Sequence, residues 1–167
     1  MENKTNARRM IVCLDDTDSN DGMCTTYLAA LLMDELTEAG FGSVDGFPHL
    51  IRLNPTIPYK TRGNASLGFV FQFSSTACRL ESESYSKFDS GSGYESAFLK
   101  VKEHVCSRIS SFAMTDCEKT NPGAVFIPDY MFKNVKDALC DHFRKAVTDV
   151  IDVSDAFSLA DSLGISY

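Results

Sequence analysis

The chain has 167 residues and a mass of 18.4 kDa, which is enough for one domain with a substantial core and excludes a miniprotein held together by disulfides. Hydrophobic residues make up 44% of the chain and charged residues 23%, so a wholly disordered protein is excluded. The net charge of -7 excludes diffuse attraction to nucleic acid as the main activity. Any contact with phosphate therefore needs a local basic patch.

The cysteine spacing and the N-terminal residues indicate the cellular compartment in which the protein is expected. The six cysteines include no C-x-x-C pair and the three histidines are dispersed, so no zinc-site spacing is present and free thiols in a reducing cytoplasm are expected. Arg8 and Arg9 precede no apolar segment of the kind found in secretory signals. The longest apolar run, residues 28–33, is far shorter than the roughly 20 residues of a membrane span. We expect a cytoplasmic protein without a membrane partner.

Hydrophobic periodicity predicts alternating strands and helices. An apolar strand over residues 11–14 ends at a polar loop, and residues 23–38 follow with helical spacing and a glycine stop at Gly40. The further predicted elements are strands at 50–53, 67–73 and 124–127 and helices at 98–112, 135–147 and 156–163. Residues 74–93 are rich in Ser, Glu and Gly, and this composition predicts a mobile segment at the surface. The order indicates one α/β (α+β layered) domain with a mixed sheet flanked by helices.

The densest chemical signal is the acidic loop, residues 15–22, which holds four carboxylates directly after a buried strand. Carboxylates at this density repel one another unless a cation neutralises them. Hard oxygen ligands at a strand end suit Mg²⁺ shared with phosphate oxygens. The alternative, that these side chains only cap the helix and form Asx turns, has about equal weight from the pattern alone.

Two other families share parts of this pattern. An EF-hand loop starting at Asp16 needs Gly where Asp21 stands and Glu where Tyr27 stands, so calcium-loop chemistry is not expected. Asp16-x-Asp18 also resembles the haloacid-dehalogenase phosphotransferases, in which the first Asp is the nucleophile. Asn20 stands where that family has Thr or Val, so a phosphatase of this type remains an imperfect alternative.

Three small side chains, Cys24, Thr25 and Thr26, stand at the expected helix start. Unpaired backbone N–H groups and the helix dipole favour a phosphate at such a position. On position alone, an ordinary helix cap is the stronger interpretation for either threonine. Cys24, with no histidine nearby in the sequence, is expected to be a small buried side chain.

The second chemical signal is residues 52–64, within which we define residues 55–64 as the basic loop. Lys60 and Arg62 supply donors for phosphate, and Gly63 allows close backbone approach. No G-x-x-x-x-G-K-[ST] motif occurs, so this is not a Walker A loop. Alone, the loop is better explained as a solvated segment whose cations pair with surface acids. Together with the acidic loop it predicts a polyphosphate site, because metal and cations bind opposite sides of a triphosphate.

Residues 14–19, 22–28 and 50–64 closely resemble the N-terminal part of archaeal agmatidine synthetases, the tRNA-isoleucine agmatinylcytidine synthetases. The resemblance continues more weakly through residues 121–127 and covers most of the chain. Enzymes of this family use ATP to join agmatine to the wobble cytidine of an isoleucine tRNA with a CAU anticodon. The resemblance therefore implies tRNA and agmatine as partners.

The resemblance also implies a kinase-like ATP-binding domain that uses ATP and Mg²⁺ to phosphorylate the cytidine C2 oxygen before agmatine displaces the phosphate. It places Asp15, Asp16 and Asp18 at the metal and catalytic positions and Thr25 at the threonine that becomes phosphorylated. It places the nucleotide-facing positions at Lys60, Thr61, Arg62, Gly63 and Asn64.

Family members are longer than this chain and carry a zinc ribbon, whereas paired cysteines are absent here. We therefore expect residues 1–167 to be a single kinase-like domain, the N-terminal fragment of a longer synthetase, with weak RNA affinity of its own. Two alternatives stay open: a non-catalytic nucleotide-binding or interaction module, and the dehalogenase-like phosphatase.

Overall fold

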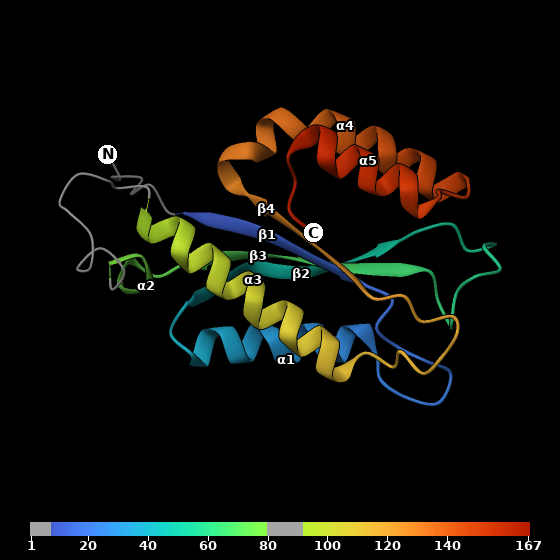
Figure 1. Cartoon of the computed structure of the whole chain (residues 1–167), viewed down its shortest axis with the longest axis horizontal. Coiled ribbons are helices and arrows are strands. Elements are labelled where there is room, and N and C mark those ends of the chain that lie inside the picture. Colours follow the sequence, from blue (N-terminus) through green and yellow to red (C-terminus); the bar gives the residue numbers. More distant parts are fainter. Residues whose placement is uncertain (1–7, 80–91) are drawn as a thin grey trace.

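The computed structural model describes residues 8–79 and 92–167. In this part of the chain, one sheet with the strand order β2-β3-β1-β4 carries helices on both faces (Figure 1). The elements in chain order are β1 (Arg9–Asp15), α1 (Thr25–Glu38), β2 (Gly42–Arg52), β3 (Ala65–Phe73), α2 (Ser75–Arg79), α3 (Ser92–Phe112), β4 (Gly123–Pro128), α4 (Asp129–Thr148) and α5 (Val153–Leu163). The expected layered α+β class is confirmed.

The larger core fills the space between the sheet and helices α1 and α3. Alternation along β1 turns Met10, Val12 and Leu14 into this core, where they are almost completely inaccessible. The other large, fully buried members come from α1, α3, β3 and β4: Leu28, Leu32, Leu36, Val101, Val105, Phe69, Phe71 and Phe126. This packing fixes the end of β1 relative to the start of α1, so it holds both ends of the acidic loop.

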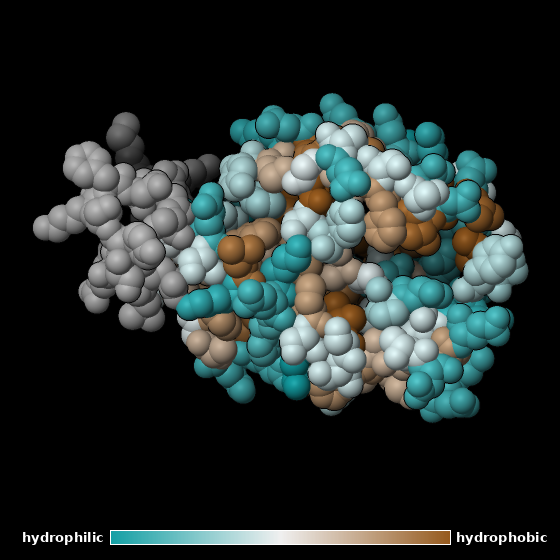
Figure 2. Space-filling view, viewed as in Figure 1, coloured by the Kyte–Doolittle hydropathy of each residue, from teal (hydrophilic) through white to brown (hydrophobic). Residues whose placement is uncertain are grey.

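A smaller core lies on the opposite face of the sheet, under α4 and α5. It is built on Ile127, Val135 and Ile165, with Ile11 of β1 packed against it. Helix α5 has no buried residue at all, and Val153 and Phe157 are largely exposed. Hydrophobic residues are accordingly visible among polar ones in the part of Figure 2 where α4 and α5 lie. The described helices include none long and apolar enough to cross a membrane.

The sheet differs from the expected mixed one, because every strand pair in the described residues is antiparallel. The chain passes from β1 through α1 to β2, a connection that commonly gives a parallel neighbour. Here β3 folds back on β2 as a hairpin and inserts between β2 and β1. Strands β1 and β2, which run in the same direction, are therefore not neighbours, and the expected mixed sheet is corrected to an antiparallel one.

All eight predicted elements are present, but several begin earlier than predicted. Strand β2 starts at Gly42, where exposed side chains and a bulge between Asp45 and His49 remove the alternating pattern. Within the segment expected to be mobile, residues 75–79 form α2 and residues 92–93 begin α3. The remainder of that expectation, residues 80–91, lies outside the described residues.

An ion-pair cluster joins α1 to α3 beside the larger core. The Glu35 carboxylate accepts hydrogen bonds from Arg108 Nε at 2.9 Å and from the Arg108 terminal nitrogen, and it lies 2.9 Å from His104 Nε2. Desolvation raises the pKa of Glu35, but the hydrogen bonds from Arg108 and His104 outweigh it and hold the pKa below its usual value. The charged form of Glu35 therefore stabilises the contact between the two helices.

We expect Glu35→Gln to lower the free energy of unfolding at pH 7 by about 1 kcal/mol, as for a partly exposed ion pair. Because the folded-state pKa of Glu35 is depressed, its contribution is present above the unfolded pKa of about 4.3 and disappears as the pH falls through the folded pKa. Urea unfolding across that range measures the difference. Glu38→Gln, at an exposed position of the same helix, serves as the control, and a Glu35→Gln deficit that is equally large at acid pH would contradict the assignment.

Candidate functional site

A cavity of about 270 Å³ lies where the acidic loop, the start of α1 and the basic loop meet. Asp15 and the acidic loop come directly from the end of central strand β1, whereas the basic loop connects β2 to β3. The acidic side of the cavity is lined by Asp15, Asp16, Asp18, Cys24, Thr25 and Thr26. Two segments more than thirty residues apart in sequence therefore share one site.

The backbone is strained near the start of the acidic loop and directly after its end. Asp16 and Met23, with φ of 53° and 58°, are the non-glycine residues with positive φ in the described part of the chain. Such conformations cost roughly 1–3 kcal/mol each and cluster at functional sites. Between them, the Ser19 hydroxyl accepts hydrogen bonds from the Asp21 and Gly22 N–H groups. Helix α1 therefore starts at Thr25, two residues later than predicted, because Met23 is left-handed.

The acidic loop holds negative charge that the described protein groups compensate only in part. Burial, and to a lesser extent the charges of Asp16 and Asp18, raises the pKa of Asp15 to about 7, although its carboxylate accepts the Asp16 N–H at 2.8 Å. Burial also raises the pKa of Asp16, against the hydrogen bond that its carboxylate accepts from Asn121 N–H at 2.7 Å. Both carboxylates would be stabilised by a cation.

The carboxylates do not form a closed metal site by themselves. Among residues 8–79 and 92–167, no three His, Cys, Asp or Glu side chains come together as a set of metal ligands. Mg²⁺ is commonly held by one or two carboxylates, with phosphate oxygens and water completing its six ligands. Asp15 and Asp16 therefore fit a Mg²⁺ ion that arrives with a phosphate compound.

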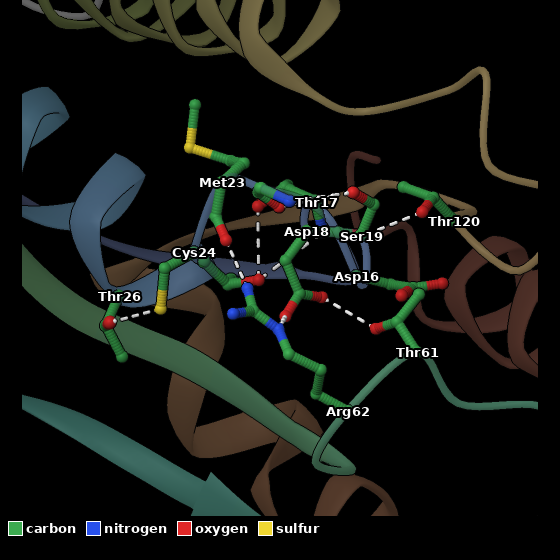
Figure 3. A network of polar contacts seen from close by, with 12 residues as sticks. Asp16, Thr17, Asp18, Ser19, Met23, Cys24, Thr26, Thr61, Arg62 and Thr120 are labelled. Atoms are coloured by element: carbon green, nitrogen blue, oxygen red, sulfur yellow. Dashed lines mark hydrogen bonds and ion pairs between the residues drawn. The ribbon is translucent and has the colours of Figure 1, made fainter.

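Asp18 ties the basic loop to the acidic loop (Figure 3). Its carboxylate accepts hydrogen bonds from Thr61 Oγ1 and from Arg62 Nε, both at 2.8 Å. The Arg62 guanidinium also donates to the carbonyl oxygen of Met23. The expectation that a cation of the basic loop pairs with an acid is correct for Arg62, but its partner belongs to the candidate site itself.

The other predicted residues of the basic loop line the cavity directly: Lys60, Gly63 and Asn64. The Lys60 ammonium donates to the carbonyl oxygen of Pro55 in its own loop. A side chain at Gly63 would bring its Cβ within 3.2 Å of the Arg52 guanidinium, so this position is tight. All five predicted loop residues are therefore found at the cavity or docked on its acidic side.

Thr25 lines the cavity without acting as a helix cap. The N-cap of α1 is Cys24, which makes no capping hydrogen bond through its side chain. The Thr25 side chain is buried, and its Oγ1 accepts a hydrogen bond from Thr17 Oγ1 at 3.1 Å. Thr17 is completely buried, and no role was predicted for it from the sequence. The cap interpretation of Thr25 is therefore wrong.

Residues 113–122, after α3, hold the acidic loop from the other side. Thr120 Oγ1 donates to the Asp18 carbonyl oxygen at 2.6 Å, and Met114 N–H donates to the Thr17 carbonyl oxygen at 3.2 Å. With the bond from Asn121 to Asp16, they fix three successive residues of the loop. In the sequence, residues 121–127 carry only a weaker part of the family resemblance, which was the one signal available for them.

The Cys24 thiol is not the buried small side chain that the sequence predicts. It lines the cavity and lies 2.8 Å from Thr26 Oγ1. The hydrogen bond with Thr26 lowers the pKa of the Cys24 thiol, and the nearby Arg62 charge contributes in the same direction. Cys24 and Thr26 therefore belong to the polar rim of the site.

Part of the cavity lining is apolar. It contains Leu50, Ile57, Tyr59 and Leu67, of which Tyr59 is 72% exposed. A cavity lined by carboxylates, by cations and by an exposed aromatic ring suits a ligand that combines phosphates with a flat ring.

Comparison with protein families gives one match over nearly the whole chain, in which the TiaS TCKD domain aligns with residues 11–167. The isoleucine-tRNA 2-agmatinylcytidine synthetase TiaS of Methanosarcina acetivorans is 47% identical over 157 residues, covering 94% of this chain and 31% of the relative. The protein of the same name from Methanosarcina mazei is 45% identical over 157 residues, with the same coverage. The chain thus spans less than a third of the length of these relatives.

Solved structures give the same result. The crystal structure of TiaS in complex with its isoleucine tRNA and ATP matches with a TM-score of 0.71 and 39% identity, over 95% of this chain and 31% of that chain. The complex of TiaS with the same tRNA, AMPCPP and agmatine matches with a TM-score of 0.68 and 37% identity over the same shares. Both loops lie inside the matched residues, and the chain belongs to the TiaS TCKD domain family.

Proposed function

We propose that this chain is the ATP- and Mg²⁺-binding phosphoryl-transfer domain of a ligase that attaches agmatine to the wobble cytidine of an isoleucine tRNA. The observation that carries the proposal is the meeting of the acidic loop and the basic loop at one cavity beside the start of α1. The names of the relatives support the tRNA substrate, and the solved complexes with ATP, AMPCPP and agmatine support the small-molecule substrates.

Each side of the cavity has a distinct role in this proposal. Asp15 and Asp16 would hold Mg²⁺, which when bound polarises phosphate oxygens and neutralises developing negative charge. Lys60 and Arg62 supply cations for the phosphates, and Gly63 allows close approach of the backbone. Asp18 positions Thr61 and Arg62 through its two hydrogen bonds.

Thr25 is the proposed acceptor of a phosphoryl group. Its oxygen would form the new bond to phosphorus, the bond from that phosphorus to the leaving oxygen of ATP would break, and the hydroxyl proton would pass to a carboxylate of the acidic loop. The transferred group would lie at the first turn of α1, where N–H donors and the helix dipole stabilise negative charge. In a second step the phosphorus would bond to the cytidine C2 oxygen, its bond to the Thr25 oxygen would break, and the threonine hydroxyl would be restored.

We propose that residues 1–167 form a single kinase-like domain. The relatives are longer, and we propose that most contacts to tRNA and agmatine are made by the part of the relatives that this chain does not span. The net charge of -7 supports weak RNA affinity of the chain alone. A non-catalytic nucleotide-binding module is the second candidate. It is favoured by the Arg62–Asp18 pair, in which one proposed phosphate donor is already bound to protein.

Arg62→Ala is expected to weaken Mg-ATP binding about tenfold, because a hydrogen bond to a charged group contributes roughly 1.5–3 kcal/mol. Calorimetric titration of the purified chain with ATP and Mg²⁺ measures the change. Arg144→Ala, which removes an exposed arginine paired with Asp141 on α4, is the matched control. Equal affinities of the Arg62→Ala and Arg144→Ala variants would remove the basic loop from the site.

Incubation with Mg-ATP is expected to add one phosphate at Thr25. Thr25→Ser should retain the reaction because it keeps the hydroxyl, whereas Thr25→Val should lose it at nearly unchanged ATP affinity. Intact-mass spectrometry with peptide mapping locates the phosphate, and Thr37→Val, near the other end of α1, is the control.

Phosphate found only at other residues, or none when the complete synthetase and tRNA are supplied, would overturn the role of Thr25. Magnesium-dependent ATP binding without any ATP consumption under those conditions would favour the non-catalytic module. Hydrolysis of phosphate esters without ATP would favour the dehalogenase-like alternative.

A further inference from the structure

Asn54 is a buried polar residue at the base of the basic loop, where β2 has just ended. Its side chain and backbone form hydrogen bonds in three directions: to the end of α4, to Thr56 and to Asn64. The loop closes at the same point, because Leu53 N–H donates to the Asn64 carbonyl oxygen at 3.0 Å. Asn54 therefore lies at the junction from which Lys60, Thr61 and Arg62 extend.

The first direction leads to the C-terminal end of α4. Asn54 N–H donates to the Ala146 carbonyl oxygen at 3.0 Å, and its Nδ2 donates to the carbonyl oxygens of Thr148 and Asp149, both at 3.3 Å. The last carbonyls of a helix have no partner inside the helix and need donors from elsewhere. Asn54 supplies these donors from a segment about ninety residues earlier in the sequence.

The second and third directions lead into the basic loop. Asn54 Oδ1 accepts hydrogen bonds from Thr56 N–H at 3.0 Å and Thr56 Oγ1 at 2.7 Å, and the Asn54 carbonyl oxygen accepts one from Asn64 Nδ2 at 2.9 Å. The amide is thus used as both donor and acceptor, which an aliphatic side chain cannot reproduce. Figure 1 shows the loop between β2 and β3 at the same end of the molecule as the junction of α4 and α5.

We propose that Asn54 is a positioning residue for nucleotide binding, which anchors the basic loop to the end of α4 so that Thr61 and Arg62 stand opposite Asp18. The inference rests on the proposed function for the identity of the ligand. The anchoring itself concerns the free protein. A loop of ten residues that lost this anchor would sample many conformations, and binding a nucleotide would then have to order it.

The first test measures the anchor without nucleotide. Asn54→Ala should accelerate hydrogen–deuterium exchange in peptides covering residues 55–64, because it removes the Nδ2 bonds to the end of α4 and the Oδ1 bonds from Thr56, while the backbone bond to Ala146 stays. Thr148→Ala is the matched control, since it changes the side chain and keeps the carbonyl that accepts from Asn54. Val135→Ala is the second control, because it weakens the packing of α4 on the sheet without touching the loop. Unchanged exchange in Asn54→Ala, or equal acceleration in Val135→Ala, would overturn the proposal.

The second test measures Mg-ATP affinity in a double-mutant cycle. Asn54→Ala alone should weaken binding about fivefold to tenfold, whereas adding it to Arg62→Ala should change the affinity less than twofold, because Asn54 acts through Arg62. Full additivity of the two changes would overturn the proposal. If Asn54→Ala does not fold, Asn54→Asp replaces it in both tests, since it keeps the acceptor for Thr56 and loses both Nδ2 donors. A wild-type chain that binds no nucleotide would refute the proposed function, and the exchange measurement would then still decide whether Asn54 anchors the loop.

Discussion

The hydrogen bonds from Arg62 and Thr61 to Asp18 are the interaction on which the geometry of the candidate site depends. The acidic loop is held by the end of β1, by α1 and by residues 113–122, whereas the basic loop extends from the hairpin of β2 and β3. Among the described residues, the side chains of the basic loop reach the acidic side of the site through three hydrogen bonds. Thr61 and Arg62 donate to the Asp18 carboxylate, and Arg62 also donates to the Met23 carbonyl oxygen. The two loops therefore face one cavity because opposite charges hold them together.

This arrangement also explains how the site can accept a charged ligand. Asp15 and Asp16 are disfavoured as anions by burial, and Arg62 is partly exposed beside Asp18. A metal–phosphate compound brings positive charge to the carboxylates and negative charge to the arginine, so both sides gain a partner at once. Asn54 and the end of α4 limit how far the basic loop can move during that exchange.

The sequence predicted the elements well where one face of a strand or helix is buried, as along Leu67–Phe73 and α1. It failed on the first part of the edge strand β2, where residues 46–49 are all exposed. It also failed on the sheet type, because pairing partners are set by the hairpin and not by local pattern. Asp15, Thr25 and Arg62 stand in the motifs that resemble the family, and the fold places all three at or beside one cavity. Thr17 and Asn54 lie inside the two chemical signals but were given no role, and Thr120 was not singled out, since their partners lie on segments that only the fold brings close.

The most direct measurement is a crystal structure of this chain grown with Mn²⁺ and a nonhydrolysable ATP analogue. The proposed function predicts an anomalous manganese peak beside Asp15 and Asp16, with the triphosphate between this ion and the basic loop and the Arg62 guanidinium on phosphate oxygens. A nucleotide bound away from the cavity, or a cavity in which the manganese ion lies apart from both carboxylates, would contradict the proposed function.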